Sequence, residues 1–330
     1  ILGSLYVLTH RYAEAEPLAA SAVAMVQGFR FQEQQTGESA GAASARHDDG
    51  LDYIFSVYLR SATGVAASSP SDLPRVRASA FTAAQDLEAS SAGQALAQAA
   101  ARVAAGQAGL GETVRRQQDL AVLAKGYDAR LLQALGSGDQ ATAATMRAEL
   151  ERSGVELTRL DAEIRAKFPR YAELVSPEAL SVEAVQKRLE PGEGLILIVP
   201  SNDDVHVFAV SKSKIVWNRV AGGARGVAEA VSALRSQVGA GETRAAVGAY
   251  GTAVASGSRP FDRARAYGLY RDLVAPVEGA LEGVKTLYVT TSGPLSALPL
   301  GLLLTAPPQG DQAGPDTLAA APWMADKYAL

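Results

Sequence analysis

The sequence predicts a mixed fold, in which an α-helical amino-terminal part is followed by part of a three-layer α/β domain. Three observations support this prediction. The first 27 residues carry small and aromatic side chains at the spacing of a helix-turn-helix repeat. Helix-forming residues then dominate from Val76 to Phe168, and after residue 195 the pattern changes to short β-rich runs. We therefore divide the chain into three regions: 1–75, 76–175 and 176–330.

Composition narrows the classes of function. Of the 330 residues 48% are hydrophobic and 20% are charged, and the formal net charge of −4 provides no broad field to attract nucleic acid. The chain has no cysteine, which excludes a thiol nucleophile and thiolate metal sites within these residues. The apolar run from Leu295 to Leu304 is interrupted by Pro299 and Gly301 and is too short to span a membrane. We favour the cytoplasm as the compartment, and we expect no membrane contact and no cofactor.

The first region resembles part of a tetratricopeptide repeat (TPR). Small and aromatic residues at the repeat's spacing predict two closely packed helices in residues 1–27: Leu2, Gly3, Tyr6, Tyr12, Ala15 and Ala22. One such repeat cannot bury its apolar face alone, so we expect further repeats upstream and a protein partner for this region. An ordinary amphipathic helix pair is the alternative.

Residues 33–50 are small and polar without periodicity, which predicts a solvated loop. The loop contains His47, Asp48 and Asp49. These adjacent residues lack the spacing that a metal site requires, so we favour a plain loop over a metal site. A helix from Asp52 to Ser61 and a linker at 68–72 follow.

The second region predicts an antiparallel helical hairpin with its tip at 136–139, where glycines end one helix and Asp139 caps the next. Apolar residues recur at helical spacing on both arms: Leu110, Val114, Ala121, Ala124, Tyr127 or Asp128, Leu131 and Leu135, then Met146, Leu150, Leu157, Leu160, Ile164 and Phe168. Arginines on the arms alternate with acidic residues, which favours a solvated face over a basic binding stripe: Arg115, Arg116, Arg147, Arg152 and Arg159.

The third region begins with a short helix that ends at 190–194. Three β-rich runs separated by polar turns then predict an antiparallel meander: 195–200, 205–210 and 215–220. The glycines at 222 and 223 lack the spacing of a phosphate-binding loop, so we interpret them as a turn into a helix over 224–238. Residues 239–258 are rich in glycine and alanine, which predicts a mobile insertion.

An amphipathic helix and a strand complete the α/β domain. The helix, from Phe261 to Gly283, should direct seven residues at a core: Tyr267, Leu269, Tyr270, Leu273, Val274, Val277 and Leu281. The strand ends at a Ser-Gly-Pro loop that offers two serines, Ser292 and Ser296. A serine nucleophile needs a histidine base within hydrogen-bond reach and a third group that orients the histidine.

The sequence provides few partners for such a serine. Its three histidines are His10, His47 and His206, and His206 alone lies in the α/β region. A histidine in the middle of a strand is more often structural than catalytic, and Asp203 and Asp204 are better explained as turn residues than as an acid–base pair. We therefore assign no catalytic, cofactor-binding or metal-binding residue.

Four segments in this order resemble bacterial TPR-CHAT proteins: "RASAFTAAQDLEASSAGQALAQAAARVAA", "KFPRYAELVSPEALSVEAVQKRLEPGEGLI", "YGLYRDLVAPVEGALEGVKTLYVTTSGPLSALPLGLLL" and "APWMADKYAL". The resemblance covers nearly the whole chain. It implies a caspase-like α/β domain and cleavage of proteins by a cysteine peptidase. The family's catalytic motifs, of the kinds H-x-A-x-H-G and S-A-C-x-T-G, are absent here, and the resemblance implies that they lie beyond Leu330.

The loop after residue 290 departs from the family pattern. The family commonly has D-G-x-L-x-x-L-P-F at this point, and Ser292 replaces the acidic residue. The family's loop shapes the substrate side without supplying the nucleophile, so the substitution puts a substrate-binding role in doubt. Two hypotheses remain: a portion of a caspase-like cysteine peptidase regulated through its TPR region, or a non-catalytic scaffold. A serine hydrolase built on Ser292 is a distant third.

Overall fold

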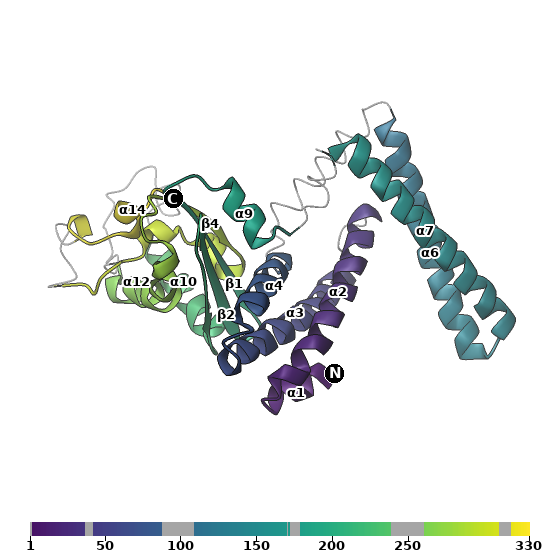
Figure 1. Cartoon of the computed structure of the whole chain (residues 1–330), viewed down its shortest axis with the longest axis horizontal. Coiled ribbons are helices and arrows are strands. Elements are labelled where there is room, and N and C mark those ends of the chain that lie inside the picture. The colour runs from purple at the N-terminus through teal and green to yellow at the C-terminus, as the bar shows by residue number, and fades with distance from the viewer. Residues whose placement is uncertain are drawn as a thin grey trace, which may run out of the picture. The chain divides into compact units, whose positions relative to one another are not determined.

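The computed structural model describes residues 2–36, 42–87, 109–169, 171, 179–238, 261–309 and 318–330. The chain forms two compact units. The first combines Ile1–Ala19, Asp52–Glu88 and Leu180–Leu330, and the second combines Ala20–Leu51 and Ala89–Ala179. Helices predominate, and a small mixed sheet lies in the carboxyl-terminal part (Figure 1). A helical region followed by an α/β domain is therefore confirmed.

The chain opens with a closely packed helix pair. Helix α1 (Leu2–Leu8) turns at His10, which adopts a left-handed backbone with φ of 57°, into helix α2 (Tyr12–Thr36). A Cβ atom added to Gly3 would lie 3.8 Å from the carbonyl oxygen of Ala15. This distance is an ordinary van der Waals contact, so the two helices lie close together here although an alanine would also fit.

A second helix pair follows, and it corrects the loop predicted over 33–50 at residues 33–36 and 42–50, whereas 37–41 lie outside the described residues. Helix α2 continues to Thr36, and helix α3 (Ala42–Ser68) already covers residues 42–50. The predicted helix of 52–61 therefore starts earlier and ends later. Alanine and arginine favour helix, and no proline interrupts the segment, so a composition of small polar residues was a poor guide. A turn at 69–72 leads into helix α4 (Leu73–Asp86).

The two helix pairs pack on each other. Gly64 of α3 faces the ring of Tyr12 so closely that a Cβ atom added to the glycine would lie 2.1 Å from the ring's Cγ atom. Beside this contact, Nη1 of Arg75 on α4 lies 3.0 Å from Oε1 of Glu16 on α2. Successive helix pairs that contact their neighbours in this way are the packing mode of helical repeats.

The sheet contains four strands in the order β3-β2-β1-β4. Strands β1 (Glu193–Ser201), β2 (Asp204–Ser211) and β3 (Ile215–Val220) form the antiparallel meander that the sequence predicts. Strand β4 (Thr286–Thr291) pairs in parallel with β1. Parallel pairing requires a crossover, and the segment between β3 and β4 provides it.

One face of the sheet packs on this crossover. Helix α10 (Ala224–Val238) has the predicted bounds, and helix α12 (Arg263–Leu269) continues as a π-helical turn (Tyr270–Val274) and a 3₁₀-helix (Ala275–Ala280). The predicted single helix is therefore wrong in its second half. Pro276 lacks a backbone N–H and clashes with the preceding turn, which explains why regular α-helix does not continue through this position. The core on this face includes Ile196, Val207, Leu234, Tyr270, Leu273 and Leu287. The predicted insertion at 239–258 lies outside the described residues.

The other face of the sheet packs on helices from the amino-terminal part. The ring of Phe81 on α4 meets Phe208 of β2 edge to face, with 5.7 Å between ring centroids. Helix α9 (Val182–Arg188) borders the same strand, and Nε2 of Gln186 donates to the carbonyl oxygen of Ser211 at 3.1 Å. The sheet thus has helices on both faces, and one of these layers comes from residues more than a hundred positions upstream.

Helices α4 and α9 are joined by one side chain. The amide nitrogen of Gln85 donates to the carbonyl oxygen of Leu180 at 2.9 Å, and its amide oxygen accepts from the Leu180 N–H at 2.9 Å. This pair of bonds, which we call the Gln85 clamp, connects residues that are 95 positions apart. The clamp therefore holds the end of α4 close to the residues that precede α9.

The segment between α4 and α9 contains the predicted helical hairpin. Helix α6 (Leu110–Ser137) ends at Gly138, whose φ is 76°, and helix α7 (Gln140–Lys167) begins at Asp139, whose side chain accepts from the Thr142 N–H at 3.0 Å. The tip is confirmed. The predicted apolar stripe is buried in the half of the hairpin away from the tip, at Leu110, Val114, Ala121, Leu157, Leu160 and Ile164, and it is only half-buried at Ala124, Tyr127, Leu131, Met146, Leu150 and Phe168. It is wrong near the tip, where Leu135 is 43% exposed and Ala134 is buried instead.

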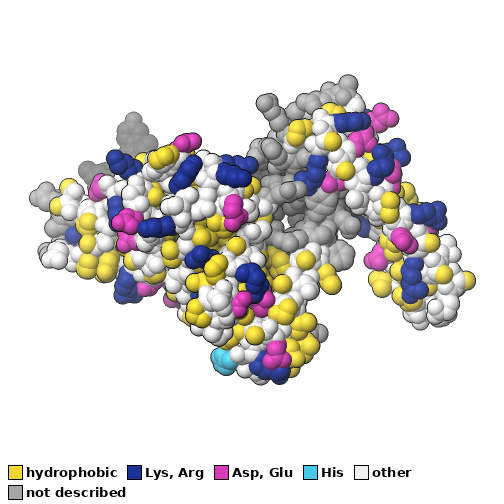
Figure 2. Space-filling view, in the orientation of Figure 1, with side chains coloured by type: hydrophobic (Ala, Val, Ile, Leu, Met, Phe, Trp, Pro, Cys, Tyr) yellow, Lys and Arg dark blue, Asp and Glu magenta, His cyan; other side chains and the backbone are white. Residues whose placement is uncertain are grey.

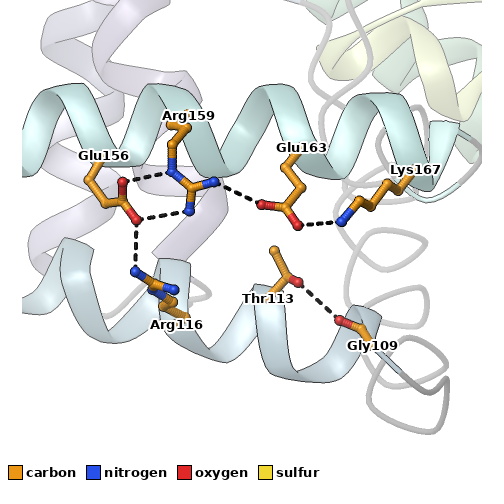
Figure 3. A network of polar contacts seen from close by, with 7 residues as sticks. All are labelled: Gly109, Thr113, Arg116, Glu156, Arg159, Glu163 and Lys167. Atoms are coloured by element: carbon orange, nitrogen blue, oxygen red, sulfur yellow. Dashed lines mark hydrogen bonds and ion pairs between the residues drawn. The ribbon is translucent and has the colours of Figure 1, made fainter.

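Three of the five arginines predicted for a solvated face pair with acidic neighbours: Arg116, Arg152 and Arg159. Arg115 instead donates to the carbonyl oxygen of Gly111. Arg159 binds Glu156 through Nε at 2.8 Å and Glu163 through Nη1 at 3.1 Å (Figure 3). Arg116 of α6 reaches Glu156 at 2.9 Å and so links the two arms, while Lys167 binds Glu163 at 2.7 Å. Hydrogen bonds from the Arg159 and Lys167 side chains lower the pKa of Glu156 and of Glu163, respectively, below the usual value.

The hairpin tip provides a simple stability test. Replacing Gly138 with alanine puts a Cβ atom on a left-handed residue, which costs about 1 kcal/mol although open space surrounds the position. The control is Gly126→Ala, at a helical position with equally open surroundings, which should gain about 0.5–1 kcal/mol. Urea unfolding monitored by circular dichroism measures both. Equal effects of the two substitutions would contradict the left-handed cap.

Candidate functional site

The loop after β4 presents the two candidate serines. Ser292 directly precedes a 3₁₀-helix (Gly293–Ala297), and its backbone N–H lies 3.4 Å from the carbonyl oxygen of Ile198. The Ser296 hydroxyl donates to the carbonyl oxygen of Gly293 at 2.8 Å. Ser296 is therefore engaged by its own turn. The loop continues through a second 3₁₀-helix (Leu300–Leu302) towards helix α14 (Met324–Lys327).

His206 is not placed to serve Ser292. The register pairs Val199 of β1 with His206, and it pairs Ile198 with Thr291, so Ser292 is level with Val199 on the opposite side. Strand β1 thus separates the two residues, and two strand spacings amount to about 10 Å. This separation exceeds hydrogen-bond reach. In the described part of the chain, the serine therefore has no histidine base.

His206 lies in a closed aromatic environment. Its side chain is fully buried, and its Nδ1 atom accepts from Nε1 of Trp217 at 3.3 Å. The indole of Trp217 stacks on Phe208 with 5.3 Å between ring centroids. Burial lowers the pKa of His206 to about 3, against the raising effect of the Asp204 charge. The imidazole is neutral at physiological pH, and its Nε2 atom has no hydrogen-bond partner within the described ranges.

Asp204 anchors an ion cluster at the start of β2. Its Oδ2 atom binds Nε of Arg219 at 2.7 Å and lies 3.8 Å from Nε of Arg60, while Oδ1 accepts from the Gly222 N–H at 2.8 Å. Burial opposes ionisation of this carboxyl group, but the bonds from Arg219 and Gly222 hold its pKa below the usual value. The neighbouring Asp203 is exposed in the turn. The two carboxylates therefore do not act as a pair.

The glycine turn before α10 has no free donors for a phosphate. The Gly222 N–H binds Asp204, the Gly223 N–H binds the carbonyl oxygen of Val220 at 3.3 Å, and the Ala224 N–H binds that of Asp203 at 2.9 Å. The interpretation as a strand-to-helix turn is confirmed.

The remaining candidates are dispersed. His10 lies in the turn between α1 and α2, where its Nδ1 atom is 2.8 Å from the hydroxyl of Tyr12. His47, Asp48 and Asp49 fall within helix α3 rather than in a loop. Across the described ranges, no cluster of three potential metal ligands is present.

A groove that the sequence did not reveal lies between β3 and the helices α3 and α4. Its volume is about 330 Å³. One wall is the strand and the turn after it, and the other is the end of α3 with the start of α4: Trp217, Asn218, Arg219 and Ala221, then Thr63, Ala66, Ala67 and Leu73. The only signal in the sequence is the small residues at 66 and 67, which leave space beside a strand that lies far away in sequence.

The surface of α1 is unusually apolar for an exposed helix. Leu2, Leu5 and Leu8 recur every three residues and are 52%, 54% and 74% exposed, and Leu18 of α2 is 42% exposed. Hydrophobic side chains accordingly gather over these helices in the space-filling view (Figure 2). Contiguous exposed apolar side chains are typical of a surface that contacts another protein.

No described helix is long and apolar enough to cross a membrane. Comparison with protein-family models, with curated proteins and with solved structures gives no match to the chain.

Proposed function

We propose that this chain is the helical and amino-terminal α/β portion of a caspase-like cysteine peptidase of the TPR-CHAT kind. In this proposal, the helix pairs receive a protein partner, and the catalytic histidine and cysteine are supplied by residues beyond Leu330. One observation carries the proposal, namely the direct packing of the second helix pair on the sheet through Phe81 and Phe208.

This packing suits a regulated peptidase. A partner bound on the exposed leucines of α1 contacts a helix pair that is joined to α3 and α4 through Gly64, Tyr12 and the Arg75–Glu16 ion pair. Helices α3 and α4 in turn contact β2, so the partner's surface and the sheet belong to one packed body. Discrete rearrangements of such packed elements carry coupling between distant sites.

The chemistry of the described residues also supports a catalytic pair located elsewhere. The sequence lacks a thiol, the imidazole of His206 is neutral and buried, and β1 separates it from Ser292. A peptidase mechanism needs a nucleophile and a base in mutual hydrogen-bond reach. We therefore expect no peptidase activity from residues 1–330 alone.

The test compares this chain with the longer protein that the proposal requires. Each is incubated with a peptide library and with separate cysteine-directed and serine-directed covalent probes. We expect cleavage from the longer protein only, abolished by thiol alkylation and unchanged by Ser292→Ala. Absence of cleavage and of thiol labelling would overturn the peptidase proposal in favour of the scaffold, and cleavage by the 330-residue chain that Ser292→Ala abolishes would favour a serine hydrolase.

A further inference from the structure

Strand β3 is an edge of the sheet, and residues of this strand form one wall of the groove. Ser211 donates its N–H to the carbonyl oxygen of Lys214 at 2.9 Å, which fixes the bonding pattern of the β2–β3 hairpin. In an antiparallel pair, bonded and non-bonded residue pairs alternate. Ser211 and Lys214 form a hydrogen-bonded pair, so the next such pairs along β3 involve Val216, Asn218 and Val220. The backbone N–H and C=O groups of the residues between them, Ile215, Trp217 and Arg219, therefore point away from β2.

These backbone groups are available for pairing. Among the described residues, no backbone hydrogen bond joins the outward-pointing groups of Ile215, Trp217 or Arg219 to another segment. Exposed strand edges of this kind accept an additional strand, and many peptide-binding domains use one. Strand addition provides affinity through the main chain, while side-chain pockets provide specificity.

The groove supplies a place for side chains of an added strand. Its volume of about 330 Å³ is at the small end for a ligand pocket, so it suits one or two peptide side chains rather than a large cofactor. Ala66 and Ala67 form an apolar wall opposite the indole of Trp217. Small residues on the helix and a flat ring on the strand leave a slot for an apolar side chain.

The charge around Arg219, which lines the groove, is unbalanced. Arg219 and Arg60 share the single carboxylate of Asp204, and Arg219 holds it at 2.7 Å whereas Arg60 stays at 3.8 Å. Within the described ranges, no other carboxylate lies within ion-pair distance of Arg60, whose side chain is 41% exposed. Two guanidinium groups on one carboxylate leave a net positive charge, which complements an acidic ligand.

We propose that the outer edge of β3 binds an extended peptide segment that carries a carboxylate. The segment adds as a fifth strand beside β3, an apolar side chain enters the groove between Trp217 and Ala67, and a glutamate or aspartate pairs with Arg60. This inference is independent of the peptidase proposal, because it requires neither the exposed leucines of α1 nor a catalytic pair.

The test uses the 330-residue chain and a labelled eight-residue peptide of alternating threonine and valine with one central glutamate. In a Trp323→Phe background, Trp217 is the only tryptophan and reports occupancy of the groove by its fluorescence. We expect saturable binding that weakens about tenfold when lysine replaces the glutamate, and a similar loss when alternate peptide nitrogens are methylated, because methylation removes the main-chain donors.

Protein variants locate the site. Ala67→Phe places a ring in the groove at an exposed helical position, and it should weaken binding about tenfold. Arg60→Gln leaves the Arg219–Asp204 pair in place and should abolish the preference for glutamate over lysine, whereas the matched control Arg235→Gln, on α10, should preserve it. Binding that is unaffected by Ala67→Phe would overturn the proposal. So would the absence of binding, or a self-associated chain in sedimentation that Ala67→Phe dissociates.

Discussion

Replacing Gly64 with alanine should destabilise the first unit by about 3 kcal/mol, because the added Cβ atom would lie 2.1 Å from Cγ of Tyr12 and 2.3 Å from its Cδ2 atom. These atoms are the base of the ring, not its far end. A small rotation cannot clear them, so the tyrosine has to leave its rotamer or helices α2 and α3 have to separate. Chemical unfolding of the variant, monitored by circular dichroism, measures the loss.

Two further variants identify the cause. Gly226→Ala, in helix α10, adds the same methyl group where nothing lies within 4 Å, and it should stabilise the protein by about 0.5–1 kcal/mol through helix propensity. The double variant Gly64→Ala with Tyr12→Ala removes the ring that clashes, and it should be more stable than Gly64→Ala alone. If the double variant is the less stable of the two, the helix pairs do not contact each other through this glycine.

The stability of the first unit should decrease as the pH falls below about 6.5, and His206 should account for much of the decrease. Burial lowers the pKa of His206 to about 3 in the folded state, from 6.5 in the unfolded chain. Between pH 3 and pH 6.5 the unfolded chain binds one proton more at His206 than the folded chain does. The contribution of the neutral imidazole to stability is therefore fully present above pH 6.5 and is lost as the pH falls. The slope approaches about 1.4 kcal/mol per pH unit.

The measurement is the free energy of unfolding in urea between pH 7 and pH 5, above the range where most carboxylates titrate. His206→Phe should remove most of the slope, because a phenyl ring fits beside Trp217 and binds no proton. His10→Gln is the matched control at an exposed histidine, and it should retain the slope. If His206→Phe keeps the same dependence of unfolding free energy on pH, the imidazole of His206 is not buried in its neutral form.

Local patterns predicted the elements of the sheet well, because alternation and turn residues determine them directly. The three strands of the meander, the helix at 224–238 and the hairpin tip at Asp139 follow from side chains within a few residues of each position. The π-helical turn before Pro276 was missed, although the proline was a visible signal. The α-helical pattern already changes at Tyr270, before the turn that a proline disturbs.

The candidate site depends on contacts that are distant in sequence, and these could not be predicted. Nothing near Phe81 indicates that it packs on Phe208, and nothing near Ala67 indicates that Trp217 lies opposite. Whether His206 can reach Ser292 also depends on contacts that are distant in sequence. The sequence identified His206 as the one histidine in the α/β region, but only the strand order shows that β1 separates it from Ser292.

The Gln85 clamp has a consequence for how this protein can change over evolution. Residues 88–179 begin and end at a single pair of hydrogen bonds, so a change in their length does not have to be accommodated by the sheet. The entropy of closing such a segment varies only slowly with its length. Whole heptads can therefore be gained or lost from the hairpin, or another small domain substituted for it, while the helices and strands on either side of Gln85 and Leu180 keep their register.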